Sequence, residues 1–125
     1  MALAFTGEMT YYSPSVGLGS CGQTFADTDL IVAISTAKMN SGGNPSNNPL
    51  CFSTITITNS AGVSQDAKVT DTCGGCAEND IDVSPAVFQA FGSLDEGRIS
   101  GIQWTGSAFG ASKRGVSGNL VARKE

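Results

Sequence analysis

The stretch that carries most information about this chain, residues 69–85, reads VTDTCGGCAENDIDVSP. It places two carboxylates, Asp71 and Asp82, at opposite ends of a short loop of cysteine and glycine, each where an apolar β run meets a turn. A half-buried carboxylic acid can protonate or hydrogen-bond a glycosidic oxygen, whereas ordinary hydrolysis also needs a partner base. The pair predicts a carbohydrate site, and the presence of a base would separate an enzyme from a binding protein.

The composition indicates a single all-β domain. A chain of 125 residues has room for one compact core. Sixteen glycines, only 14% charged residues and frequent Thr, Ser, Val and Ile favour strands joined by tight turns, with little helix. The net charge is −4, but residues 1–110 hold three basic and ten acidic side chains, a net charge of −7. An acidic body repels a phosphate backbone, so we expect no nucleic-acid partner.

The four cysteines predict disulfides in an oxidising compartment. Cys21, Cys51, Cys73 and Cys76 lie in a small glycine-rich chain without histidine. The CxxC at 73–76 has zinc-knuckle spacing, but no second CxxC or histidine pair completes a tetrahedral site, so we expect no metal. A thioredoxin-like role lacks its βαβ context. No apolar run has the length of a membrane span and no signal peptide precedes Phe5, so the expected secretion rests on the cysteines and on the resemblance below.

Hydrophobic patterning places five strands and one helix. Residues 51–59 alternate with period two, and 30–35 form an apolar run expected to be buried on both faces. Ser84 and Pro85 supply an N-cap and a first-turn proline for a short helix over 84–91. Residues 13–20 and 40–49 are predicted loops. We expect a domain over residues 5–104, an irregular basic tail over 105–125, and strands at 5–12, 30–35, 51–59, 64–70 and 98–104.

Six short motifs occur in the order typical of expansin-like proteins: GxxTYY at 7–12, SCG at 20–22, NPLC with TITITN within 48–59, VTD at 69–71, IDVSP at 81–85 and IQW at 102–104. Over residues 5–104 the chain resembles the first domain of expansins and, most of all, the single-domain fungal loosenins, with barwin-type and rare lipoprotein A barrels as wider relatives. The resemblance implies a six-stranded double-psi β-barrel with one short helix, secretion, and a polysaccharide groove across one face. It also implies that Cys21 pairs with Cys51 and Cys73 with Cys76.

The resemblance also implies which residues form the groove. Thr10, Tyr12, Asp71 and Asp82 match its polar positions in expansins, and Asp82 also matches the acid of related inverting endoglucanases. Those enzymes carry a base aspartate directly after the aromatic pair, where this chain has Ser13. A serine hydroxyl is no base near neutral pH without an activating histidine or lysine, and the chain has no histidine. We therefore expect no enzymatic activity and no cofactor.

The aromatic residues depart from the expansin pattern. Expansins carry an aromatic shortly after the position of Asp71, where this chain has Thr72 and a cysteine, and they carry a second, planar aromatic domain that is absent here. Neighbouring residues on a strand point to opposite sides, so one of Tyr11 and Tyr12 belongs to the core, and the resemblance places Tyr12 in the groove. Tyr11 and Trp104 are further carbohydrate-binding candidates, although a tryptophan at this position is more often core.

Both acids have a structural interpretation as well. Asp82 precedes the predicted helix and could satisfy backbone N–H groups near its start. Asp71 could orient Asp82 or hold the loop instead of contacting a ligand.

The predicted function is that of a secreted, monomeric protein that binds cell-wall polysaccharide such as cellulose or chitin and loosens it without hydrolysis. The alternative is a protein partner, because related small barrels act as protease inhibitors and secreted effectors. That partner would contact exposed loops such as 40–49 rather than the groove.

Overall fold

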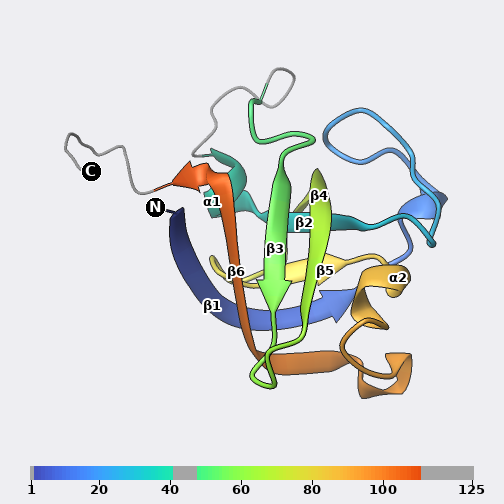
Figure 1. Cartoon of the computed structure of the whole chain (residues 1–125). Helices are drawn as coiled ribbons and strands as arrows, with labels where there is room; N and C mark the ends of the chain where they lie inside the picture. Colours follow the sequence, from blue (N-terminus) through green and yellow to red (C-terminus); the bar gives the residue numbers. More distant parts are fainter. Residues whose placement is uncertain (1, 41–47, 111–125) are drawn as a thin grey trace.

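The structure, a computed structural model, describes residues 2–40 and 48–110 (Figure 1). Its strands close into a six-stranded barrel in the order β1-β5-β2-β4-β3-β6, which confirms the architecture that the resemblance implies. The strands are β1 (Ala2–Tyr11), β2 (Ile31–Ser35), β3 (Thr54–Thr58), β4 (Ser64–Cys73), β5 (Ile81–Val83) and β6 (Arg98–Gly110).

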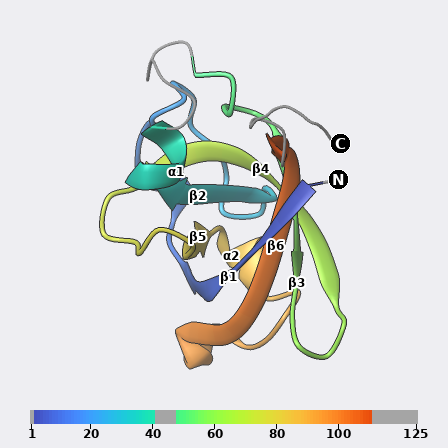
Figure 2. The same cartoon turned by 90° about the vertical axis from the view of Figure 1, so that its left-hand side faces the viewer.

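Two parallel pairs give the barrel its unusual topology. β1 runs parallel to β5 and β2 parallel to β4, whereas the other neighbouring pairs are antiparallel. β4 and β5 follow each other in the chain, yet each lies beside β2. The loop over residues 74–80 must therefore pass the end of β2, close to the short helix α1 (Thr36–Asn40), as Figures 1 and 2 show. This crossing brings Asp71 and Asp82 to the two sides of one strand.

The core follows from strand alternation. Val32 and Ile34 of β2 point into the barrel, and all five residues of this strand are buried, as its apolar run predicts. Trp104 is only 1% exposed and packs against the rings of Phe5 and Phe109, with centroids 4.7 and 5.2 Å away. Its indole N–H donates to a backbone carbonyl, Asn79 O, at 2.9 Å. Trp104 is therefore a core residue and not part of an exposed platform.

The predicted helix is present as α2 (Pro85–Phe88), shorter than expected. Ser84 is its N-cap, and the Ser84 hydroxyl accepts a hydrogen bond from the backbone of Val87 at 3.4 Å. Helix α1 and two single-turn 3₁₀ segments, Pro14–Val16 and Leu94–Glu96, were not predicted. Elements this short lack enough turns to produce a helical periodicity.

The last strand is longer than its pattern predicts. β6 continues through residues 105–110, where the irregular tail was expected to begin, and Thr105 pairs with Ala4 of β1. Gly106 and its small neighbours dilute the alternation, while the buried Phe109 ties this extension to the core. The barrel therefore reaches beyond the expected boundary at residue 104, and β1 begins before residue 5.

Strand β3 begins later than predicted. Residues 51–53 form a turn in which the amide of Cys51 donates to Asn48 O and that of Ser53 to Leu50 O. Phe52 adopts a positive φ of 68°, which no regular strand residue has. Strand β5 has only three residues, too few for its pattern to show.

Both implied disulfides are formed. Cys21 bonds to Cys51 and Cys73 to Cys76, with Cα atoms 5.7 and 5.4 Å apart. The first joins the loop after β1 to the turn before β3, and both of its cysteines pack against the core. The second closes the exposed turn at the end of β4.

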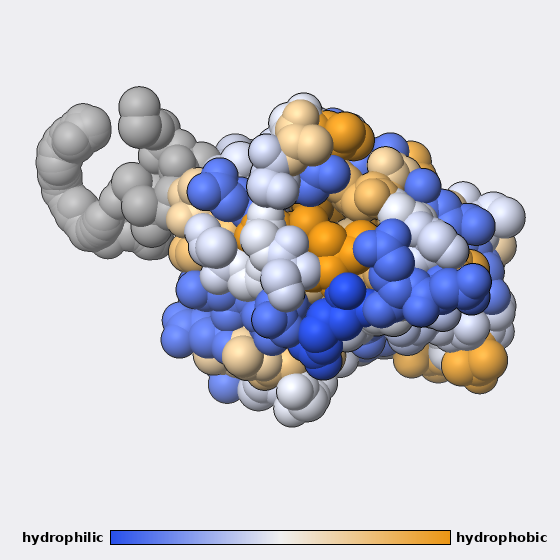
Figure 3. Space-filling view, turned by 90° about the horizontal axis from the view of Figure 1, so that it is seen from below, coloured by the Kyte–Doolittle hydropathy of each residue, from blue (hydrophilic) through white to orange (hydrophobic). Residues whose placement is uncertain are grey.

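Two predicted segments lie mostly or wholly outside the described residues. Most of the predicted loop 40–49 and the tail from residue 111 lie outside the described residues. Within the described part of the chain, the helices fall short of the length and hydropathy of a membrane span. The face seen from below is mostly hydrophilic, with apolar residues visible in its middle (Figure 3).

Candidate functional site

The strand register aligns the predicted groove acids on one side of the barrel. Ala33 of β2 pairs with Asp71 of β4 on one side and with Asp82 of β5 on the other. Asp82 in turn pairs with Thr10 of β1. Neighbouring strands lie about 4.8 Å apart, so the two aspartates stand roughly 10 Å apart across Ala33. Because alanine is small, no long side chain separates the two carboxyl groups. The four paired positions, Asp71, Ala33, Asp82 and Thr10, form a row across β4, β2, β5 and β1.

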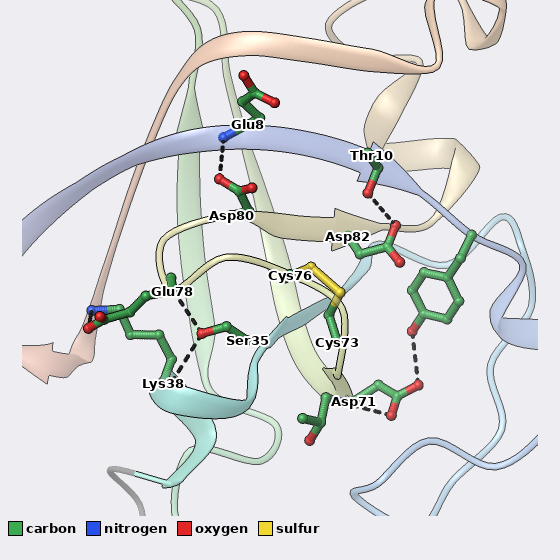
Figure 4. The surroundings of a disulfide bond; sticks show 12 residues. Glu8, Thr10, Ser35, Lys38, Asp71, Cys73, Cys76, Glu78, Asp80 and Asp82 are labelled. Atoms are coloured by element: carbon green, nitrogen blue, oxygen red, sulfur yellow. Dashed lines mark hydrogen bonds and ion pairs between the residues drawn. A yellow bond between two sulfur atoms is a disulfide. The ribbon is translucent and has the colours of Figure 1, made fainter.

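Asp82 is paired with a neighbouring hydroxyl group. Its side chain is half-buried, and its Oδ1 accepts a hydrogen bond of 2.9 Å from the hydroxyl of Thr10 (Figure 4). Burial raises the pKa of Asp82 above the usual aspartate value, and the nearby charge of Asp71 adds to the effect, while the Thr10 hydrogen bond opposes it. Asp82 is therefore poised to change protonation state at a higher pH than a solvated aspartate.

The structural interpretation of Asp82 as a helix-capping residue is wrong. Helix α2 is capped by Ser84, whose hydroxyl also donates to Asp29 O at 2.6 Å. Asp82 lies on the opposite side of β5 from Ile81 and Val83, which fill the core. Its carboxyl group thus faces away from the barrel interior.

Asp71 holds the neighbouring loop in place. Its Oδ1 accepts hydrogen bonds from the backbone amides of Ser20 and Thr72, both at 2.8 Å, and its Oδ2 accepts a long one of 3.5 Å from the Tyr12 hydroxyl. Gly19 allows this approach, since a Cβ there would lie 2.5 Å from Thr70 O. Asp71 therefore holds the loop, as one of its two interpretations predicted, and it also lies at one end of the row.

The two tyrosines point to opposite sides, as expected. The Tyr11 ring packs against Phe88 with centroids 4.8 Å apart, and its hydroxyl donates to Leu94 O at 3.0 Å. The Tyr12 hydroxyl instead reaches Asp71. Burial raises the pKa of Tyr12, and the charge of Asp71 raises it further, so this phenol stays protonated and remains a hydrogen-bond donor.

A pocket of about 170 Å³ opens at the Tyr12 end of the row. Its walls come from the loop after β1 and from the end of β4, and they include Phe25, Leu18 and Val16 together with Tyr12 and Asp71. Loop residues without periodicity carry no signal of such a pocket. Two of the sequence motifs contribute a wall residue each, Tyr12 from GxxTYY and Asp71 from VTD, and the SCG motif lies beside the pocket, where Ser20 holds Asp71.

The loop between the two acids is fixed from several sides (Figure 4). Asp80 accepts a hydrogen bond from the amide of Glu8, and the Ser35 hydroxyl donates to Glu78 O. Lys38 forms an ion pair of 3.6 Å with the Glu78 carboxylate. Across residues 2–40 and 48–110, no three His, Cys, Asp or Glu side chains are grouped to hold a metal ion.

Proteins with related sequences include a protease inhibitor and an allergen homologue. The papain inhibitor of Streptomyces mobaraensis is 37% identical over 100 residues, which cover 79% of this chain and 68% of that protein. An allergen homologue from Arthroderma benhamiae is 36% identical over 112 residues, covering 79% of this chain but only 38% of that protein. No protein-family model matches the chain.

Solved structures share the barrel. The Streptomyces papain inhibitor has a TM-score of 0.73 at 34% identity, over 82% of this chain and 93% of that one. A Clavibacter michiganensis expansin in complex with cellohexaose has a TM-score of 0.68 at 25% identity, over 83% of this chain and 50% of that one. The fungal elicitor cerato-platanin, at 0.57 and 15% identity over 79% and 90%, shares the fold alone.

The closed six-stranded fold and its likeness to an expansin place the chain in the class of expansin-like double-psi β-barrels, as the sequence motifs predicted. Within it, the chain belongs to the family of the Streptomyces papain inhibitor, most of whose length it matches.

Proposed function

We propose that this protein is secreted, binds cell-wall polysaccharide along the row of Thr10, Asp82 and Asp71, and loosens it without hydrolysis. The observation that carries the proposal is the hydrogen-bonded pair of Thr10 and Asp82 beside the pair of Tyr12 and Asp71 on one side of the barrel. The likeness to an expansin solved with cellohexaose supports the choice of ligand.

The mechanism is competition for hydrogen bonds. A glycan chain in a wall is held to its neighbours by hydroxyl groups. The Asp82 carboxylate accepts hydrogen bonds from such hydroxyls, and charge-assisted bonds are about twice as strong as neutral ones. The Tyr12 phenol, kept protonated, donates its single O–H to Asp71, and its oxygen can accept a hydrogen bond from a glycan hydroxyl. A glycan lying on this row exchanges its interchain bonds for bonds to the protein and is released when the protein moves on.

Hydrolysis is not expected because the site has an acid without a base. Ser13, at the position of the base in the related hydrolases, is exposed and has no histidine to activate it. Asp71 is engaged by two backbone amides and Tyr12, so it is not available to activate a water.

The proposal is tested by incubating the protein with insoluble cellulose and chitin and measuring the bound fraction and the soluble reducing sugar. We expect binding, with sugar release no greater than that of a protein-free blank. Release that grows in proportion to protein and time would show an enzyme instead. Ser13→Asp is the companion variant, and even weak hydrolysis by it would support the missing-base explanation.

A second candidate function is inhibition of a papain-like protease. Its support is the 37% identity to a papain inhibitor together with two exposed apolar side chains, Val16 at 86% and Leu18 at 74%. Both line the pocket beside Tyr12. Apolar side chains that project from a loop held by a disulfide and by Asp71 are suited to insert into a cleft on another protein.

This second candidate predicts that the double change Val16→Ser and Leu18→Ser weakens inhibition of papain by at least about tenfold while glycan binding is kept. Val63→Ser is the matched control, because Val63 is 44% exposed but lies at the far end of the β3–β4 hairpin. The readout is the inhibition constant against papain. Equal inhibition by wild type and both variants would exclude this loop as the contact.

A further inference from the structure

We propose that the polysaccharide groove continues past Thr10 onto β6, where Arg98, held by Glu8, contacts the next sugar of the bound chain. This inference rests on the proposed polysaccharide function and extends it to a residue that no sequence motif indicated. It places Arg98 at the fifth position of the row, after Asp71, Ala33, Asp82 and Thr10.

The strand register places Arg98 beside Thr10 on the outer side of the barrel. Thr10 pairs with Asp82 on β5 and, on its other side, with Arg98 on β6. Residues directly opposite each other in an antiparallel pair project from the same side of the sheet. Thr10 points away from the core toward Asp82, so Arg98 projects on that outer side as well.

The Arg98 side chain is held by Glu8 while its guanidinium group stays accessible. Arg98 Nη1 lies 2.8 Å from Glu8 Oε1, and the Ser100 hydroxyl donates to Glu8 Oε2 at 3.2 Å. Glu8 is two residues before Thr10, on the same side of β1. The Arg98 side chain remains 56% exposed, and a guanidinium has five N–H donors, of which this pair uses one nitrogen.

A purely structural role explains these contacts less well. An exposed ion pair of this kind contributes little to the stability of a protein. A planar guanidinium restrained by a carboxylate, in contrast, is pre-organised to donate to hydroxyl groups or to stack on a flat ring face. Arg98 also acts on the groove itself, because its charge lowers the pKa of Asp82 and opposes the effect of burial.

The geometry has a measurable consequence for ligand length. Counted along the curved surface of the barrel, the row crosses three strand spacings from Asp71 to Thr10 and a fourth from Thr10 to Arg98. A glycan that follows the row therefore gains a contact only when it is long enough to reach β6. The affinity should keep rising with chain length beyond the point at which a shorter groove would be filled.

The experiment is calorimetric titration with cello- and chito-oligosaccharides of increasing length. For Arg98→Ala we expect unchanged affinity for the shortest oligosaccharides that bind and a loss of about three- to tenfold for the longest. Arg98→Lys, which keeps the charge but loses the planar fork, should show most of that loss. Lys68→Ala is the control, since Lys68 is an exposed cation on β4 outside the row.

The possible outcomes distinguish a failure of the Arg98 contact from a failure of the proposed polysaccharide function. If Asp82→Asn weakens binding at every length while Arg98→Ala changes none, the extension is wrong and the polysaccharide function stands. If Arg98→Ala weakens all lengths equally, Arg98 acts through Asp82 or through stability and makes no separate contact. If the wild type binds no oligosaccharide and no insoluble glycan, both are wrong.

Discussion

Asp82→Asn should weaken polysaccharide binding by at least about tenfold and abolish wall loosening while the barrel stays folded. The carboxylate accepts hydrogen bonds from the ligand that an amide accepts less strongly, and bonds to a charged group contribute about 1.5 to 3 kcal/mol. Asparagine keeps the shape, and its carbonyl oxygen can still accept the hydrogen bond from Thr10. The fold around Thr10 and β5 therefore has no reason to rearrange.

The measurement pairs a binding isotherm on insoluble glycan with thermal melting of the same preparation. Asp80→Asn is the matched control, because Asp80 lies two residues away and its carboxylate accepts the backbone N–H of Glu8 outside the row. Unchanged loosening by Asp82→Asn at an unchanged melting temperature would contradict the central role of Asp82. Unaltered affinity for papain in that variant would show that the loop site works independently.

The same variant should change the pH dependence of stability. The folded state binds a proton at Asp82 more tightly than the unfolded chain, whose aspartate pKa is about 3.9, because burial raises the pKa of Asp82. The charge on Asp82 therefore costs no stability below about pH 4, and its cost grows as the pH rises through the folded pKa. Asp82→Asn should melt at the wild-type temperature or above it near neutral pH, with a smaller loss of stability between pH 4 and neutrality.

Loss of the Cys21–Cys51 disulfide is expected to have the largest effect on stability. The bond closes a loop of 30 residues, and the chain-entropy relation gives about 3 to 4 kcal/mol for a loop of that length. The change Cys21→Ser with Cys51→Ser should lower the free energy of unfolding by this amount. It should also loosen the segment in which Ser20 holds Asp71, next to Cys21.

The matched control is Cys73→Ser with Cys76→Ser. Its ring spans only three residues of separation, so the same relation gives about 2 kcal/mol or less. Urea unfolding of both variants against wild type measures the difference, and non-reducing peptide mapping verifies the pairing. A larger loss from the short ring than from the long one would contradict the chain-entropy explanation.

Local patterns predicted much of the fold. The alternation over β3 and the apolar run of β2 predicted strands, because the side-chain period and the burial of a strand are visible in residues that are neighbours in the chain. Ser84 and Pro85 predicted the start of α2 for the same reason, since capping involves residues three apart. The order of motifs, through the resemblance, added closure of the barrel and both disulfides.

What local patterns could not give is where distant strands meet. Ala33 separates Asp71 from Asp82, and Arg98 lies beside Thr10, only because β4, β2, β5, β1 and β6 pair in one register. That register is set by the packing of the whole core, which also buries Trp104 and draws residues 105–110 into β6. The two acids, the four cysteines and Ser13 at the matched base position can be identified from the sequence alone. Their alignment into a row with Arg98 at its end depends on tertiary pairing, because contacts between residues far apart in the chain leave no local periodicity.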